Sequence, residues 1–196
     1  LMLVWDGKQV AAVDGRETAP AAATDQLFMK DGKPMAFYDG VVGGRSVGAP
    51  GTVRALALAH ERYGKLPWAS LFEPAITLAE QGFVISPRLA TLLAKDPYLA
   101  KDPEARAYFY QADGSPRAAG TRLTNPALAG VLRTLARDGA DAFYRGPIAE
   151  AMVAKGTDCL LYPAHDGSLT LATRKTLLHA LTLKGLPLTA PLAVLT

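Results

Sequence analysis

The placement of proline is the sequence feature that most restricts how this chain folds. Four dipeptides pair proline with a preceding residue that can begin a helix: Glu73-Pro74, Ser86-Pro87, Asp102-Pro103 and Asn125-Pro126. Proline is tolerated in the first turn of a helix, where its missing N–H has no intrahelical acceptor, but it breaks a helix interior. Serine, aspartate and asparagine also cap a first turn, whereas glutamate is a poorer cap. The pattern predicts a succession of separate helices.

Other helices are expected on both sides of this array. From residue 52 to residue 63 apolar side chains recur at helical spacing, and Gly64 is placed to end that helix. The helix after Asn125 has one apolar face and ends at Gly139, so it should pack on a sheet or on neighbouring helices. Gly146-Pro147 begins a last helix that reaches Lys155.

Residues 1–13 predict a β-hairpin. Two apolar runs are separated by Asp6-Gly7, a dipeptide typical of tight turns with positive backbone angles. Both runs are apolar on successive residues, which predicts strands covered on both faces. The expected fold class is therefore α+β, with an N-terminal β-hairpin followed by a mainly helical array.

The stretch between residues 24 and 51 is rich in turn dipeptides and predicts a loop with one short strand. Its glycine-rich end, residues 43–51, is a candidate for function because glycine lets a backbone approach a ligand closely. The alternative is a tight connection that leads into the helix at residue 52. The lysine and spacing of a phosphate-binding loop are missing.

Composition excludes several functional classes. The 196 residues suit one domain, and 49% hydrophobic with 20% charged residues is ordinary for a folded protein. The net charge of +3 comes from basic residues that are mostly scattered among acidic ones, so no nucleic-acid partner is predicted. No apolar run is long enough to predict a membrane span.

Metal and cofactor sites are not predicted. Cys159 is the single cysteine, which excludes an internal disulfide and a multi-cysteine metal site. The three histidines, His60, His165 and His179, lack the spacing of metal ligands. We therefore expect no metal and no cofactor.

The candidate functional stretch is Asp14-Gly15-Arg16-Glu17-Thr18-Ala19-Pro20. Arg16 follows an apolar, strand-like run, and strand ends are where folds commonly present ligand-binding groups. The planar guanidinium can donate two parallel hydrogen bonds to one carboxylate, which lysine cannot do. The alternative is an ordinary ion pair between Arg16 and Asp14 or Glu17. Local chemistry leaves both interpretations open.

The order of motifs along the chain resembles the large-chain portion of the gamma-glutamyltranspeptidases. The resemblance covers residues 1 to about 155 and rests on runs such as Gly43-Gly44-Arg45-Ser46-Val47-Gly48 and Asp141-Ala142-Phe143-Tyr144-Arg145-Gly146. The matching segments are residues 1–7, 13–23, 43–53, 61–67, 74–83 and 138–146.

The resemblance implies a fold, an activity and a role for one residue. The fold is the αββα sandwich of the N-terminal-nucleophile hydrolases, and the activity is transfer or hydrolysis of gamma-glutamyl groups from glutathione-like donors. Arg16 resembles the family arginine that holds the donor α-carboxylate, with Asp14, Glu17 and Thr18 expected to orient it. The resemblance also implies self-cleavage of a precursor and a periplasmic or extracellular location.

The catalytic residue that the resemblance implies is not expected in this chain. In the family, the N-terminal threonine of a separate small chain is both nucleophile and base. Thr157 and Thr176 are not followed by histidine as the family nucleophile is, so neither is assigned. The implied partners are a gamma-glutamyl donor and the missing small chain.

The two ends of the sequence predict a fragment. The chain begins inside a strand-like run without a leader peptide. We expect residues 1–155 to be a partial large-chain segment and residues 156–196 to be an atypical tail, frame-shifted or disordered. Two alternatives stay open: an acylase of the same family that cleaves another amide, such as a glutaryl side chain, and a non-catalytic product of a broken gene.

Overall fold

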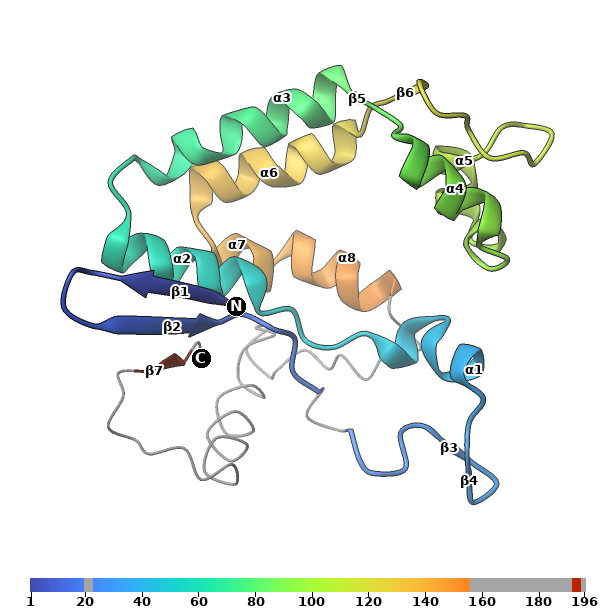
Figure 1. Ribbon diagram of the computed structural model, residues 1–196, viewed down its shortest axis with the longest axis horizontal. Helices are drawn as coiled ribbons and strands as arrows, with labels where there is room; N and C mark the ends of the chain where they lie inside the picture. The colour runs from blue at the N-terminus through green and yellow to red at the C-terminus, as the bar shows by residue number, and fades with distance from the viewer. Residues whose placement is uncertain (20–22, 156–191, 195–196) are drawn as a thin grey trace. The chain divides into compact units, whose positions relative to one another are not determined.

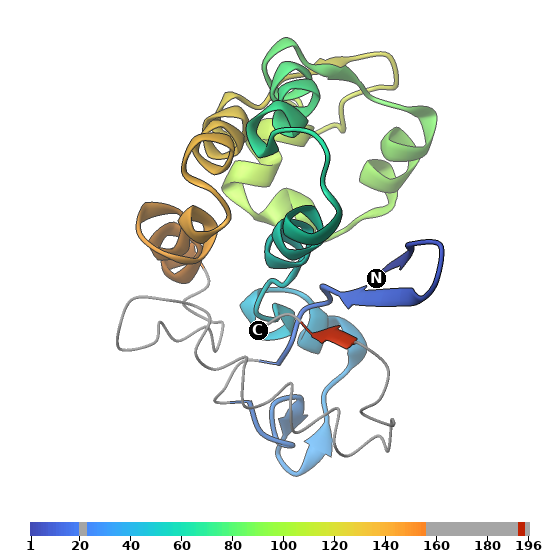
Figure 2. The ribbon, with the colours of Figure 1, turned by 90° about the vertical axis from the view of Figure 1, so that its left-hand side faces the viewer.

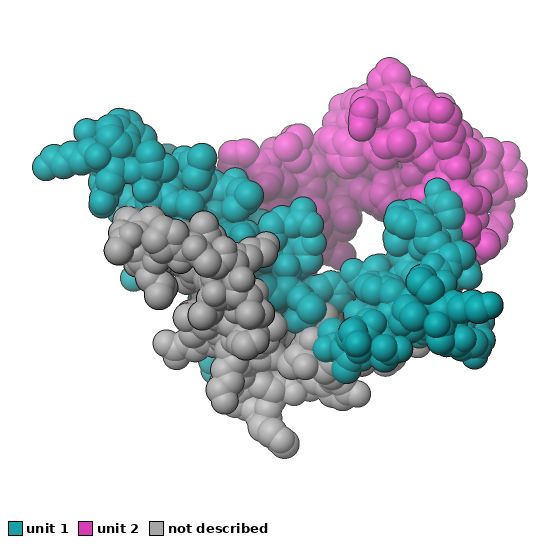
Figure 3. Space-filling model, turned by 60° about the horizontal axis from the view of Figure 1, so that its bottom comes forward, with its two compact units in different colours: residues 1–68, 137–196 teal, residues 69–136 magenta. Residues whose placement is uncertain are grey.

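The computed structural model describes residues 1–19, 23–155 and 192–194 (Figure 1). The chain divides into two compact units, one formed by Leu1–Trp68 with Arg137–Thr196 and the other by Ala69–Ala136 (Figure 3). Helices dominate the described residues and strands are short. This agrees with the expected hairpin and mainly helical array.

The first unit begins with the predicted hairpin. Strands β1 (Met2–Trp5) and β2 (Val10–Asp14) pair antiparallel, with Trp5 opposite Val10 at the turn end. Residues 6–9 connect the strands, so the turn is longer than a two-residue connection. Within it the Asp6 carboxylate accepts hydrogen bonds from the backbone N–H groups of Lys8 and Gln9 at 2.8 and 2.9 Å. A third strand, β7 (Leu192–Val194), pairs parallel to β2.

The two faces of the hairpin differ, so the prediction of strands covered on both faces is wrong for the described residues. Val13 is 1% exposed and packs against Ala55 and Ala59 of helix α2 (Thr52–Tyr63). On the opposite face Leu3 is 73% and Trp5 62% exposed. Alternate residues of a strand point to opposite faces, and helix α2 covers one of them.

Helix α2 ends where the sequence predicts, but for a different reason. Gly64 follows it with φ −65°, which is not the left-handed conformation that usually favours glycine at a helix end. A Cβ on Gly64 would instead lie 2.4 Å from the His60 carbonyl oxygen. Glycine is therefore required here because a side chain would collide with His60, and not because of the backbone conformation.

Residues 24–51 contain more structure than the predicted loop with one strand. Two short strands, β3 (Met29–Lys30) and β4 (Lys33–Pro34), pair antiparallel across Asp31 and Gly32, whose φ angles are both positive. This is the geometry of a two-residue hairpin turn. Helix α1 (Phe37–Val41) and a 3₁₀ turn, η1 (Gly44–Ser46), then lead toward α2.

Two short helices complete the described part of the first unit. Helices α7 (Asp141–Tyr144) and α8 (Pro147–Lys155) form a small core in which Tyr144 and Ala149 are buried. Val53 of α2 packs against this core. Helix α2 is therefore held between the hairpin and α7–α8.

The second unit is a set of short helices. The main helices are α3 (Glu73–Gln81), α4 (Pro87–Lys95), α5 (Pro103–Phe109) and α6 (Pro126–Asp138). The smaller elements are the 3₁₀ turns η2 (Trp68–Phe72) and η3 (Leu99–Lys101) and the antiparallel pair β5 (Phe83–Val84) and β6 (Arg122–Leu123). Helices α3 and α6 run side by side (Figures 1 and 2) and bury Ile76, Ala79 and Ala129 between them.

All four predicted helix starts are confirmed, and three of them have a side-chain cap. Side-chain oxygens of Ser86, Asp102 and Asn125 accept first-turn N–H groups at 3.1, 2.8 and 2.9 Å. At the fourth position Glu73 is already helical, and Phe72 precedes the helix without a side-chain cap. Glutamate is too long to fold back as a cap in the way that serine, aspartate or asparagine does.

Candidate functional site

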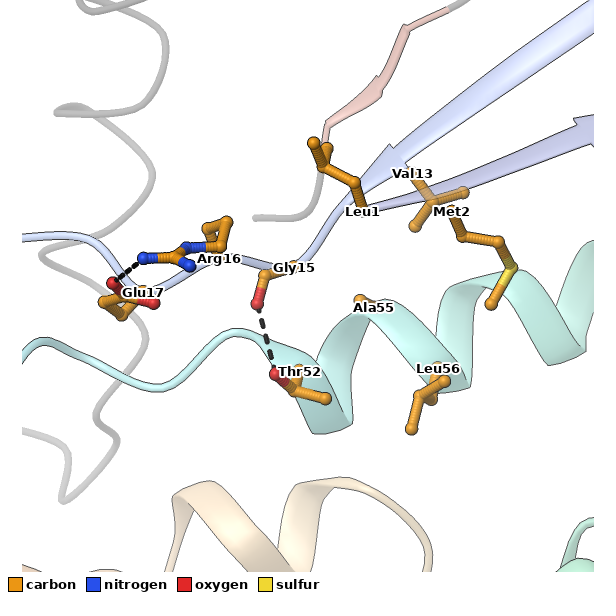
Figure 4. Close-up of a pocket in the computed structure, with 9 residues that line it drawn as sticks. All are labelled: Leu1, Met2, Val13, Gly15, Arg16, Glu17, Thr52, Ala55 and Leu56. Atoms are coloured by element: carbon orange, nitrogen blue, oxygen red, sulfur yellow. Dashed lines mark hydrogen bonds and ion pairs between the residues drawn. The ribbon is translucent and has the colours of Figure 1, made fainter.

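The Arg16 segment, residues 14–18, leaves β2 and lies along the start of helix α2 (Figure 4). Thr18 and Ala49 exchange two backbone hydrogen bonds of 3.2 and 2.9 Å. The Thr52 hydroxyl, in the first turn of α2, donates to the Gly15 carbonyl at 3.3 Å. The structure thus brings together the two stretches that the sequence marks as candidates for function.

Three glycines make this approach possible. A Cβ on Gly15 would lie 2.4 Å from the Ala55 Cβ, and one on Gly51 would lie 2.8 Å from the Arg16 carbonyl oxygen. A Cβ on Gly48 would meet the Thr18 carbonyl oxygen at 2.8 Å. The glycines at 48 and 51 are therefore explained by contact between two chain segments, which favours the tight-connection interpretation of residues 43–51.

Arg16 presents its guanidinium at the surface. Its side chain is 71% exposed and donates from Nη2 to the Glu17 carboxylate at 2.5 Å. The Asp14 carboxylate accepts the Arg16 backbone N–H at 3.0 Å. The ion pair that the sequence left as an alternative is thus present, while Asp14 holds the backbone of Arg16.

Two of the residues expected to orient Arg16 contact it, and the third lies farther along the segment. Thr18 is held through its backbone to Ala49, and its hydroxyl is buried without a hydrogen-bond partner among the described residues. The pKa of Glu17 is lowered, first by a hydrogen bond from its own backbone N–H and then by Arg16. Glu17 is therefore an anion at neutral pH and occupies one side of the guanidinium.

A cavity of about 370 Å³ adjoins this segment. Arg16 and Glu17 form its charged part, and Met2, Val13 and Leu56 contribute apolar walls. The whole lining is Leu1, Met2, Val13, Gly15, Arg16, Glu17, Thr52, Ala55 and Leu56 (Figure 4). Such a cavity can accept a small ligand that carries a carboxylate at one end and methylene groups behind it.

Behind α2 lies a polar cluster that the sequence did not single out as part of a site. The Tyr144 hydroxyl accepts the backbone N–H of Arg54 at 3.0 Å. The Arg54 guanidinium pairs with Asp141 and lies 5.0 Å from the centre of the Tyr144 ring. A usable signal was Gly51, since a helix that starts after glycine has no side-chain cap of its own.

The described residues contain no group of three or more histidine, cysteine, aspartate or glutamate side chains that could hold a metal ion. His60 is engaged in packing, with Nε2 2.7 Å from the Leu66 carbonyl oxygen and its ring against Trp68. None of the described helices is long and apolar enough to cross a membrane. Other residues discussed from the sequence lie outside the described ranges: Thr157, Cys159, His165, Thr176 and His179.

Known proteins resemble this chain over most of its length. The family model described as gamma-glutamyltranspeptidase matches residues 1–172. Glutathione hydrolase 3 of Arabidopsis thaliana is 40% identical over 143 residues, which are 72% of this chain and 22% of that protein. Acylase ACY 1 proenzyme of Pseudomonas sp. (strain SE83) is 36% identical over 171 residues, which are 84% of this chain and 29% of that protein.

A solved structure gives a similar result. The crystal structure of Helicobacter pylori gamma-glutamyltranspeptidase superposes with a TM-score of 0.73 at 28% identity, covering 78% of this chain and 44% of that one. This chain therefore spans less than a third of the two curated relatives and less than half of the solved chain. The predicted boundary at residue 155 stays a prediction, and the tail assigned to residues 156–196 lies outside the described residues except for residues 192–194.

Proposed function

This chain belongs to the gamma-glutamyltranspeptidase family, and we propose that its residues 1–155 form the donor-binding part of an enzyme that transfers or hydrolyses gamma-glutamyl groups. Family members are gamma-glutamyltransferases and glutathione hydrolases. The proposed donor is glutathione or a related gamma-glutamyl amide. The proposed partner is a small chain that carries the nucleophile, as in an enzyme matured from a proenzyme.

The observation that carries this proposal is the setting of Arg16. Its guanidinium is exposed beside a cavity, while hydrogen bonds to Asp14 and from Thr52 hold the backbone around it. Only Nη2 is engaged by Glu17 among the described contacts, so other N–H donors of the guanidinium are available to a ligand. A donor carboxylate can therefore bind Arg16 in a forked arrangement.

The proposed reaction divides between two chains. Arg16 holds the α-carboxylate of the donor, and the threonine hydroxyl of the partner chain attacks the γ-carbonyl carbon. The threonine amine takes the hydroxyl proton and passes it to the donor nitrogen, so that collapse of the tetrahedral intermediate breaks the C–N bond, releases the donor amine and leaves an acyl-enzyme. Water then completes hydrolysis, or an acceptor amine completes transfer. In this scheme the present chain binds and orients the donor but does not react with it.

Paired donors test the proposed role of Arg16. Gamma-glutamyl anilide and 4-aminobutanoyl anilide differ by the α-carboxylate, so we expect the second to bind far more weakly to the mature enzyme. Arg16→Gln should remove this preference, because the remaining interactions are common to both donors. A preference that survives Arg16→Gln would contradict the proposal.

A second candidate is an acylase that cleaves another amide, and the similarity to Acylase ACY 1 proenzyme over 84% of the chain favours it. A glutaryl group keeps the terminal carboxylate of a gamma-glutamyl group but lacks the amine, so Arg16 fits both donors. Comparing kcat/KM for glutaryl and gamma-glutamyl anilides separates them. Higher kcat/KM for the glutaryl donor would support the acylase function and overturn the transferase proposal.

A further inference from the structure

Helix α2 begins without a side-chain cap. The residue before it is Gly51, which has no side chain to accept the N–H groups of the first turn. A larger residue does not fit there, because its Cβ would lie 2.8 Å from the Arg16 carbonyl oxygen. The close approach of the Arg16 segment thus removes the usual way of capping this helix.

Tyr144 supplies an acceptor from a distant part of the sequence. Its hydroxyl accepts the backbone N–H of Arg54, a first-turn residue of α2, at 3.0 Å. The ring is fixed because Tyr144 is 3% exposed, packs with Ala149, and lies against the Arg54 guanidinium. That guanidinium is held in turn by Asp141.

The opposite side of the same helical turn holds the Arg16 segment. Thr52 donates its hydroxyl hydrogen bond to Gly15, and the Ala55 methyl group lies where a side chain on Gly15 would be. A displacement of this turn therefore moves the backbone next to Arg16. Tyr144 and Arg16 are linked through one turn of helix, although neither contacts the other in the described interactions.

We propose that Tyr144 is a positioning residue for donor binding: its hydroxyl caps α2 and thereby sets the place of the Arg16 guanidinium. This inference rests on the proposed function of Arg16 as the donor-carboxylate clamp. It assigns a role in donor affinity to helix α7, which is far from Arg16 in the sequence.

The test uses Tyr144→Phe in the mature enzyme that contains this segment, with Tyr110→Phe as matched control. Tyr110 is also buried, and its hydroxyl also forms a hydrogen bond with the backbone, here donating to the Leu93 carbonyl at 3.1 Å, but it lies in the second unit. We expect Tyr144→Phe to raise the KM for gamma-glutamyl anilide about three- to tenfold, as for loss of one helix cap, with kcat retained. The control should leave the KM unchanged.

A double-mutant cycle separates positioning from general destabilisation. With Arg16→Gln already present, Tyr144→Phe should add no further increase in KM, and it should have no effect on the donor without an α-carboxylate. Additive effects, or equal effects on both donors, would overturn the inference. If Tyr144→Phe fails to fold, the same cycle is run with Thr52→Val, and Thr52→Ser is its control. Additive effects of Thr52→Val and Arg16→Gln on the KM would also overturn the inference.

The two proposals fail in different ways. If Arg16→Gln leaves the KM for gamma-glutamyl anilide unchanged, the proposed function of Arg16 is wrong and this inference falls with it. If Arg16→Gln raises the KM and Tyr144→Phe does not, the clamp stands and the positioning role of Tyr144 is wrong.

Discussion

The Thr52 hydroxyl donates a hydrogen bond to the Gly15 carbonyl, 3.3 Å away, so the first turn of helix α2 holds the residue that precedes Arg16. This contact joins positions 37 residues apart in sequence. Both residues line the cavity next to the guanidinium.

Removing the Thr52 hydroxyl should weaken donor binding. Thr52→Val keeps the size and branching of the side chain but cannot donate to Gly15, whereas Thr52→Ser keeps the donor. We expect Thr52→Val to raise the donor KM about two- to tenfold and Thr52→Ser to change it little, since one neutral hydrogen bond is lost or kept. Steady-state kinetics of the mature enzyme measure both, and equal KM values would contradict the contact's role.

Replacing Arg16 by lysine should raise the donor KM by about tenfold or more, because lysine keeps the charge but loses the forked pair of hydrogen bonds. The matched control is Arg137→Lys. Arg137 is also 71% exposed and also pairs with the next residue, Asp138, but lies outside the cavity. An increase in KM of the same size for both variants would point instead to a general effect of replacing an exposed, ion-paired arginine by lysine, unrelated to the cavity.

Glycine substitutions should have opposite effects at two positions. Gly51→Ala places a methyl group 2.8 Å from the Arg16 carbonyl oxygen, so it should destabilise the chain and weaken donor binding. Gly130→Ala lies in helix α6 with open space around it, and alanine favours helix by about 0.5–1 kcal/mol relative to glycine. Thermal unfolding followed by circular dichroism should therefore show a lower Tm for Gly51→Ala and an unchanged or higher Tm for Gly130→Ala.

Alkaline pH should destabilise the fold through Tyr144. Burial raises the pKa of the Tyr144 hydroxyl above its ordinary value of 10.0. Below pH 10 the group is protonated in both the folded and the unfolded chain and contributes no pH dependence. Above pH 10 the unfolded chain ionises first, so stability falls as the pH rises toward and through the folded-state pKa.

Tyr144→Phe removes this titration and should flatten the alkaline loss, although it lowers stability at neutral pH by removing the acceptor for Arg54. The quantity to compare is the slope of the unfolding free energy against pH above pH 10, to which a single titrating group contributes at most about 1.4 kcal/mol per pH unit. Tyr38→Phe, at a tyrosine that is 56% exposed, serves as the control. Equal slopes for the chain and Tyr144→Phe would contradict the assigned cause.

Features that depend on neighbouring residues were predictable from the sequence. Ser86, Asp102 and Asn125 cap their helices because a short polar side chain reaches N–H groups two or three residues ahead. The hairpin of β1 and β2 forms where two apolar runs flank Asp6 and Gly7. The two-residue strands β3 and β4 escaped prediction because such short pairs carry no periodicity.

Placing the candidate site required more than local pattern. Arg16 could be located at a strand end from the sequence, but its pairing with Glu17 and the separate use of Asp14 as a backbone acceptor could not. Both carboxylates are within reach of the guanidinium in sequence. The choice between them depends on where the backbone turns after β2, which the contacts with residues 48–55 decide.

The amino-acid sequence by itself determined the helix starts, the hairpin and the position of an arginine just after a strand, since each follows from the chemistry of a few adjacent residues. The tertiary structure decided which face of the hairpin is covered and why Gly15, Gly48 and Gly51 have no side chain. It also decided that Tyr144 caps a helix that begins 92 positions earlier, at Thr52. These features depend on close contacts between segments distant in sequence, and packing of that kind follows from how the whole chain folds.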